Sequence, residues 1–126
     1  MKKLTSVFQL LSDETRLRII LLLAQDELCV CELSKNLGVS QPTISKNLTK
    51  LKDLDLVIAV RREKFISYRL KTENYILAYT VDEILKNIEV YPQLVLDQKQ
   101  LVDNRGSLIQ CCSKNKENVN KGIKND

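Results

Sequence analysis

Histidine is absent from this sequence of 126 residues. Every catalytic or metal site built on imidazole is therefore excluded, including Ser-His-Asp triads and most zinc enzyme centres. Glycine and proline are scarce, with three and two residues. Because a sandwich of many short strands needs frequent turn residues, this scarcity favours helices. The length fits one domain that can bury a real core.

Long apolar runs are also missing. The longest, Ile19–Ala24, is far too short to cross a bilayer. Lys2 and Lys3 precede a short apolar segment, but Gln9 interrupts it, and no export signal results. We therefore expect a cytoplasmic protein with no membrane partner, in a compartment that keeps thiols reduced.

The four cysteines form two close pairs, Cys29 with Cys31 and Cys111 with Cys112. Residues this close in sequence make strained disulfides with each other. In a reducing compartment, paired thiols more often bind metal ions or perform redox chemistry than form structural bridges. With no imidazole in the chain, these sulfurs are the candidate ligands for a soft metal ion.

Positive charge is concentrated in the middle of the chain. The total net charge is only +4, but residues 40–71 carry eight basic and three acidic groups, a net of +5. Residues 72–90 carry one basic and four acidic groups, a net of −3. Such a basic segment is what a face that binds a polyanion requires, although a solvated surface is the simpler alternative.

Helical periodicity dominates the N-terminal part. Apolar residues recur at helical spacing over residues 4–11, which predicts a first short helix. Ser12 is a candidate cap for a second helix that runs to about residue 24. This second helix is apolar around most of its circumference, so we expect it to be buried at the centre of the fold.

Residues 29–37 predict a third helix, which Gly38 ends. Ser40 is placed to cap a fourth helix, and Pro42 lies in its first turn, where a missing N–H costs nothing. Two short helices joined by a glycine-containing turn are typical of a helix-turn-helix, although an ordinary helical hairpin has the same outline.

The period changes between residues 56 and 70, where apolar and polar residues alternate around a charged turn. This alternation predicts a β-hairpin. Thr72 is a candidate cap for a long helix to about residue 89, and Pro92 marks its end. The predicted fold class is mainly α with a β-hairpin wing, the order of a winged helix-turn-helix.

The predicted organisation has three parts. Residues 1–90 form the DNA-binding and dimerisation domain. Residues 91–112 form a C-terminal extension that carries Cys111 and Cys112. The extension contains enough apolar residues for a sixth short helix. Residues 113–126 are rich in lysine and asparagine, and we expect this tail to be disordered.

Two surfaces follow from the predicted elements. The exposed face of the fourth helix and the hairpin tip carry side chains that reach base edges and phosphates. The predicted DNA-binding residues are Gln41, Thr43, Ser45, Lys46, Asn47, Lys50, Arg61, Arg62 and Lys64. Apolar stripes on the first and the long helix exceed what one small core covers, which predicts a homodimer. Its predicted contacts are Leu4, Val7, Phe8, Leu11, Ile76, Tyr79, Ile84 and Ile88.

The segments LSDETRLRI, ELCVCEL and SQPTIS, all within residues 11–57, together with RREKFISYRL over 61–70, closely resemble the ArsR family of metal-responsive bacterial repressors. The resemblance implies a homodimeric repressor that leaves double-stranded operator DNA when an inducer binds, and no enzyme activity. ELCVCEL resembles the thiolate box of the branches that sense arsenite, cadmium or lead. Arsenite sensors of this kind usually have a third cysteine where this chain has Ser34.

The candidate metal ligands are Cys29, Cys31, Cys111 and Cys112. As(III) and Sb(III) take three sulfurs, so the second pair is the supply for a third ligand within the chain. We expect no required cofactor and As(III) or Sb(III) as inducer. A sensor of Cd(II), Pb(II), Hg(II), reactive sulfur or oxidants is an alternative with the same fold. A small thiol oxidoreductase or metal carrier is an alternative of another class.

Overall fold

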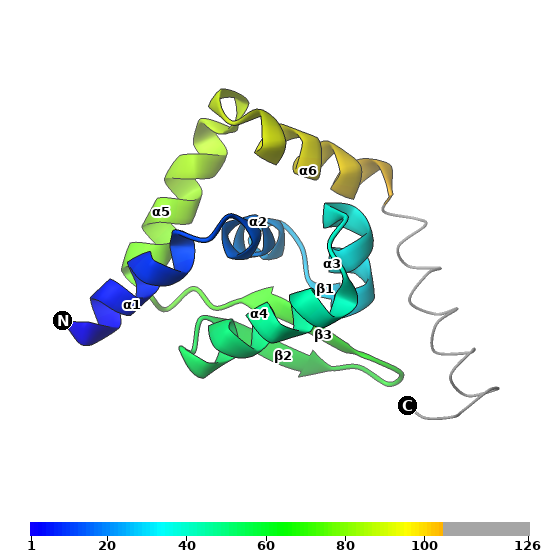
Figure 1. The fold of residues 1–126 in the computed structure, drawn as a ribbon, viewed down its shortest axis with the longest axis horizontal. Helices are drawn as coiled ribbons and strands as arrows, with labels where there is room; N and C mark the ends of the chain where they lie inside the picture. The colour runs from blue at the N-terminus through cyan, green and yellow to red at the C-terminus, as the bar shows by residue number, and fades with distance from the viewer. Residues whose placement is uncertain (105–126) are drawn as a thin grey trace.

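Residues 1–104 are described by the structure, a computed structural model, and they follow the order of a winged helix-turn-helix (Figure 1). The helices are α1 (Lys2–Leu11), α2 (Glu14–Leu23), α3 (Val30–Leu37), α4 (Gln41–Asp53), α5 (Tyr75–Lys86), the short 3-10 helix η1 (Ile88–Val90) and α6 (Pro92–Asp103). The strands are β1 (Leu28–Cys29), β2 (Val57–Arg61) and β3 (Ile66–Leu70).

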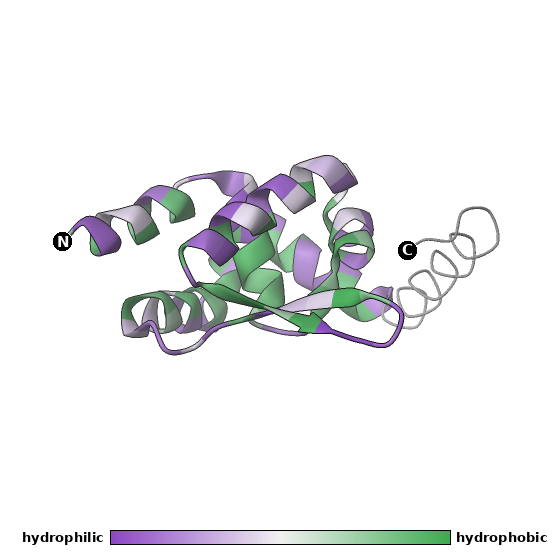
Figure 2. Cartoon of the chain, turned by 90° about the horizontal axis from the view of Figure 1, so that it is seen from below, coloured by the Kyte–Doolittle hydropathy of each residue, from purple (hydrophilic) through white to green (hydrophobic). Residues whose placement is uncertain are grey.

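Helix α2 lies at the centre of the core, as its composition predicts. All residues from Ile19 to Leu23 are at most 3% exposed. Leu33, Ile44 and Leu77 pack into the same cluster from three other helices. Figure 2 shows the hydrophobic segments gathered between the helices and the sheet. Burying each of these side chains contributes about 1.5–3 kcal/mol, so the core fixes how the other helices are placed.

Two predicted helix caps are wrong. Asp13 rather than Ser12 caps α2, and its carboxylate accepts the backbone N–H of Arg16 at 3.0 Å. Ser12 still has helical backbone angles and ends α1, whereas Asp13 has the extended backbone that an N-cap needs. Likewise Asn74 rather than Thr72 caps α5, where its side chain accepts the N–H of Leu77 at 3.0 Å.

The long helix predicted to reach residue 89 ends earlier. Helix α5 stops at Lys86, and the 3-10 turn η1 redirects the chain. Pro92 then begins α6 at a position that needs no N–H donor. The sixth helix is present, but it starts at this proline and ends at Asp103.

The helix-turn-helix is built as the sequence predicts. Gly38 ends α3 with a φ of 69°, in the left-handed region that favours glycine, and its N–H reaches the Ser34 carbonyl at 2.9 Å. The Ser34 hydroxyl donates to the carbonyl of Val39 at 2.5 Å, so it holds the turn. Ser40 caps α4, and Pro42 lies in its first turn.

The wing is an antiparallel hairpin of β2 and β3, in register from Val57 opposite Leu70 to Arg61 opposite Ile66. A third strand, β1, pairs with the other side of β3, so that the sheet order is β1-β3-β2. Cys29 of β1 lies opposite Ser67. The sequence did not predict β1, because a two-residue strand is too short to show a period of two.

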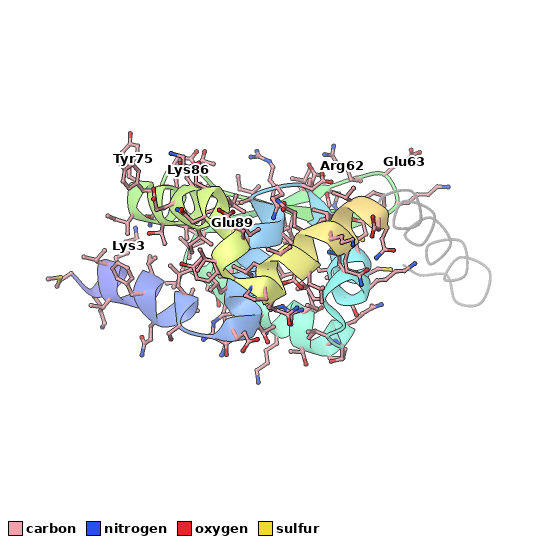
Figure 3. The ribbon with its side chains drawn as sticks, turned by 90° about the horizontal axis from the view of Figure 1, so that it is seen from above. Lys3, Arg62, Glu63, Tyr75, Lys86 and Glu89 are labelled. Atoms are coloured by element: carbon pink, nitrogen blue, oxygen red, sulfur yellow. The ribbon has the colours of Figure 1, made fainter. Side chains whose placement is uncertain are left out.

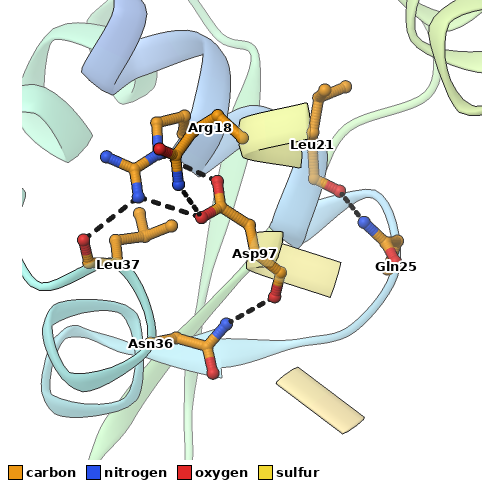
Figure 4. A network of polar contacts seen from close by, with 7 residues as sticks. Arg18, Leu21, Gln25, Asn36, Leu37 and Asp97 are labelled. Carbon is orange, nitrogen blue, oxygen red and sulfur yellow. Dashed lines mark hydrogen bonds and ion pairs between the residues drawn. The ribbon is translucent and has the colours of Figure 1, made fainter. Parts of the chain in front are cut away.

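Helix α6 belongs to the same core, because Leu94 and Leu101 are buried in it. A polar network fixes α6 against α2 and α3 (Figure 4). The Arg18 guanidinium donates to both carboxylate oxygens of Asp97 at 2.8 and 2.9 Å, and to the carbonyl of Leu37 at 3.1 Å. The side chain of Asn36 donates to the Asp97 carbonyl at 3.2 Å. The core therefore extends past the boundary predicted at residue 90.

None of the helices in residues 1–104 combines the length and the apolar character that crossing a membrane would require.

Candidate nucleic-acid interface and thiol site

The outer face of α4 presents polar and basic side chains to solvent. The exposed members of the predicted set on this helix are Gln41, Thr43, Ser45, Lys46 and Lys50. The opposite face is anchored by Ile44, Leu48 and Leu51, which are almost fully buried. The helix is thus held rigidly by one face and offers the other, the geometry with which a recognition helix enters a major groove.

Asn47 is not part of this exposed face, contrary to the prediction. It is 8% exposed, its side-chain amide donates to the Thr43 carbonyl at 2.9 Å, and its oxygen accepts Nη1 of Arg16 at 3.2 Å. The same arginine donates through Nε to the carbonyl of Leu10 at 3.2 Å. Asn47 therefore links α4 to the junction of α1 and α2. Asn47 and Arg16 are 31 positions apart in the sequence, so helical periodicity does not reveal their contact.

Lys46 and Asn47 form a matched pair of neighbours for mutagenesis. Lys46→Ala is expected to weaken operator binding and to flatten its dependence on salt by about one unit, the loss of one phosphate contact. Asn47→Ala is expected to lower the free energy of unfolding by about 0.5–1.5 kcal/mol, because it removes the hydrogen bond between Asn47 and the half-buried Arg16. Fluorescence anisotropy at several salt concentrations and chemical denaturation separate the two effects. If both variants show the same changes in operator binding and in stability, Lys46 and Asn47 do not have these separate roles.

The wing carries the second basic cluster. Arg61, Arg62 and Lys64 are all exposed, and the Arg62 N–H closes the loop on the carbonyl of Phe65 at 2.8 Å. Arg62 and Glu63 lie at the end of the molecule opposite to Lys3 and Tyr75 (Figure 3). The basic wing tip therefore lies far from the starts of α1 and α5.

Arg62 has an acidic partner in the protein. Its Nε lies 2.8 Å from Oε2 of Glu27, and its Nη2 lies 2.6 Å from Oε1. The hydroxyl of Ser67 donates to the same carboxylate. Hydrogen bonding by Ser67 and then by Arg62 lowers the pKa of Glu27, so this carboxylate is ionised at neutral pH. Sequence reasoning missed this pair, because the two residues are 35 positions apart.

Cys29 and Cys31 lie where β1 passes into α3. Cys29 is the N-cap of α3, has an extended backbone and is 4% exposed, whereas Cys31 is half-buried within the first turn. The helix predicted over residues 29–37 includes both cysteines. That expectation is wrong for Cys29, because its strand pairing with Ser67 keeps it outside the helix.

Acidic side chains surround this segment. The Glu32 carboxylate accepts the backbone N–H of Cys29 at 2.9 Å, as part of a capping box. Burial raises the pKa of Glu32, and the nearby negative charges of Asp26 and Glu27 act in the same direction. Glu32 therefore caps the N-terminus of α3, and its burial disfavours the ionised form of its carboxyl group.

Cys29 and Cys31 do not complete a metal site by themselves. Within residues 1–104, no group of three or more cysteine, aspartate or glutamate side chains is arranged to hold a metal ion. Cys111 and Cys112, the predicted source of a third sulfur, lie outside the described residues.

The predicted dimer contacts divide into two groups. Leu4, Phe8, Ile76 and Tyr79 are 38–81% exposed. Leu11, Ile84 and Ile88 pack partly against the core of the single chain, and Val7 is 3% exposed within it. Val7 therefore serves the core of one chain and has no surface to offer a partner.

Comparison with known proteins agrees with the fold and with the family that the motifs resemble. Residues 13–59 match the sequence family described as bacterial regulatory protein, arsR family. The arsenic resistance transcriptional regulator ArsR1 of Pseudomonas putida is 41% identical over 83 residues, which cover 65% of this chain and 62% of that protein. The arsenical resistance operon repressor of Staphylococcus aureus is 34% identical over 71% of this chain and 80% of its own length.

A solved structure shares the architecture. The homodimeric winged helix-turn-helix DNA-binding domain of a possible ArsR-family transcriptional regulator from Mycobacterium bovis aligns with a TM-score of 0.60 and 30% identity, over 70% of this chain and 80% of that one. These proteins are transcriptional regulators rather than enzymes. The chain spans about 62% of the length of the Pseudomonas putida regulator and four fifths of the Staphylococcus aureus repressor. It therefore belongs to the ArsR family of bacterial regulatory proteins.

Proposed function

We propose that this protein is a homodimeric transcriptional repressor that binds operator DNA and leaves it when As(III) or Sb(III) binds to its thiols. The observation that carries the proposal is the position of Cys29 and Cys31 at the start of α3, the first helix of the helix-turn-helix. A ligand that joins the two sulfurs acts directly on the unit that places α4.

Thiol chemistry favours these ions. The chain has no histidine, and thiolates select soft ions over hard ones. Two relatives carry arsenic or arsenical resistance in their names, which supports the same class of inducer here.

The third sulfur is assigned to Cys111 or Cys112. Helix α6, the last helix that the structure describes, contacts α3, the helix that begins directly after Cys29. Cys111 comes seven positions after Asn104. An extended chain of that length spans roughly 23–25 Å, which is ample for reaching the same or a neighbouring subunit.

The exposed apolar residues of α1 and α5 support the homodimer. Phe8 and Tyr79 are 51% and 81% exposed, and such large apolar side chains are costly to leave in water. A dimer places two recognition helices in successive major grooves about 34 Å apart. Sedimentation at micromolar concentration is expected to show the dimer.

One titration tests the inducer. A fluorescent operator fragment bound to the protein in reducing buffer is titrated with As(III), Sb(III), Cd(II), Pb(II) and Zn(II). Release is expected at the lowest concentration for As(III) and Sb(III), because the pyramidal geometry of these ions suits three sulfurs. Release of the operator by Cd(II) or Pb(II) but not by As(III) or Sb(III) would identify a different inducer. If no ion releases the operator, the protein is not a metal sensor.

A further inference from the structure

The contacts of Glu27 join the thiol segment to the wing. Its carboxylate accepts hydrogen bonds from the Arg62 guanidinium, at 2.8 Å from Nε and 2.6 Å from Nη2. It also accepts one from the hydroxyl of Ser67 in β3. Glu27 directly precedes β1, which ends in Cys29. One carboxylate is thereby tied to residues 35 and 40 positions later in the chain.

The backbone makes a second connection at the same place. Ser67 pairs with Cys29 on one side and with Val60 of β2 on the other, so one rung crosses all three strands. Ser67 is 2% exposed. Because packed interiors transmit displacement rather than absorb it, a shift of the Cys29 backbone is shared with both strands of the wing.

The ion pair controls how Arg62 is presented. A bidentate contact between arginine and carboxylate fixes the orientation of the guanidinium as well as its charge. The Nε and Nη2 groups of Arg62 both point to Glu27, so this edge does not reach a phosphate while the pair is closed. The side chain is 49% exposed, which leaves it accessible from solvent when the pair changes.

We propose that Glu27 is the positioning residue that carries ligand binding at Cys29 and Cys31 to the DNA-contacting wing. This inference rests on the proposed function, since it needs a ligand at the thiols. Joining the two sulfurs around one ion reshapes the N-cap of α3, and Glu27 is two residues away on the same segment. The hydrogen bonds of the Glu27 carboxylate with Arg62 and Ser67 then change, so the wing is oriented differently towards DNA. Such a link is a difference in contacts between two states, which allosteric coupling requires.

The test compares the coupling ratio, defined as the operator Kd with saturating As(III) divided by the Kd without it. Glu27→Gln keeps the size of the side chain but removes the charge that holds Arg62. The ratio is expected to fall about fivefold or more relative to the parent, within the usual range of coupling between sites. As(III) stoichiometry, measured by titration of protein thiols and by absorption of the As–S complex, is expected to stay parental. Arg62→Gln is expected to act in the same way, and the double variant to add little, because both remove one contact.

Glu63→Gln is the matched control, because it removes the same charge from an exposed residue of the wing loop. It is expected to keep the parental coupling ratio, since charge alone does not carry the signal. A parental ratio in Glu27→Gln, or an equal fall in Glu63→Gln, would overturn the inference. Loss of As(III) binding in Glu27→Gln would also overturn it, because Glu27 would then act on the thiol site itself. A parent protein that does not respond to any ion would instead reject the proposed function, and the inference with it.

Discussion

Cys29→Ser and Cys31→Ser are each expected to bind operator DNA with parental affinity and to stay bound when As(III) is added. Serine oxygen is a hard and poorly ionised ligand, so either change leaves a single sulfur at the start of α3 and no chelate there. The fold tolerates the change at residue 29, because that residue is an N-cap and serine is a preferred N-cap. Anisotropy of a labelled operator with and without As(III) measures both properties.

Val30→Ala is the matched control for these variants, because it changes the residue between the two cysteines and keeps both sulfurs. It is expected to release DNA as the parent does. Normal release by both serine variants would refute sensing through this segment and leave only the DNA-binding part of the proposal. Release lost in the control as well would indicate a disturbed α3 rather than a lost ligand.

The tail cysteines give a graded version of the same experiment. The double change Cys111→Ser with Cys112→Ser is expected to weaken the response, and each single change to be milder, because either thiol can serve as third ligand. X-ray absorption is expected to count three As–S bonds in the parent and fewer in the double variant. Three bonds and parental sensitivity in the double variant would assign the third sulfur to a second subunit or to an added thiol.

Asp97→Ala is expected to cause the largest loss of stability among substitutions of polar residues described here. Asp97 is 4% exposed and receives two hydrogen bonds from Arg18, so the change leaves a largely buried guanidinium without its counter-charge. Breaking a buried pair from one side costs about 3–5 kcal/mol. Chemical denaturation of the full chain measures the loss.

Two comparisons show whether the loss comes from the unpaired charge. The double change Arg18→Met with Asp97→Leu removes both charges, and it is expected to cost much less than Asp97→Ala alone. Asp82→Ala breaks the pair with Lys86, in which both side chains are more than 60% exposed, and no measurable change is expected. A similar loss in Asp97→Ala and the double change would show that packing of α6, not charge, is responsible.

Local chemistry alone predicted the helix-turn-helix and the hairpin. Gly38, Ser40 and Pro42 act through their own backbone and the next few residues, so their positions in the sequence are enough to place the turn and the start of α4. The alternation in residues 56–70 reports directly which side of a strand is buried. The thiol box and the basic segment were likewise visible as residue types at fixed spacing.

Choices between similar local signals needed the tertiary structure. Ser12 and Asp13 are both capable caps, and the path of the chain between α1 and α2 decided for Asp13. Asn47 has the chemistry of a base-reading residue, but the Arg16 guanidinium turned its side chain inward. Whether a polar side chain on a helix is exposed depends on what packs against it, and spacing along one helix does not contain that information.

Contacts between distant residues were decided only by the fold. The pairing of Arg18 with Asp97 spans 79 positions, and that of Arg62 with Glu27 spans 35. Charged residues of both signs are plentiful in this chain, so the sequence does not select these partners from the many possible ones. Packing of α6 on α2 and pairing of β1 with β3 select them, because these contacts bring one acid and one base together and exclude the rest.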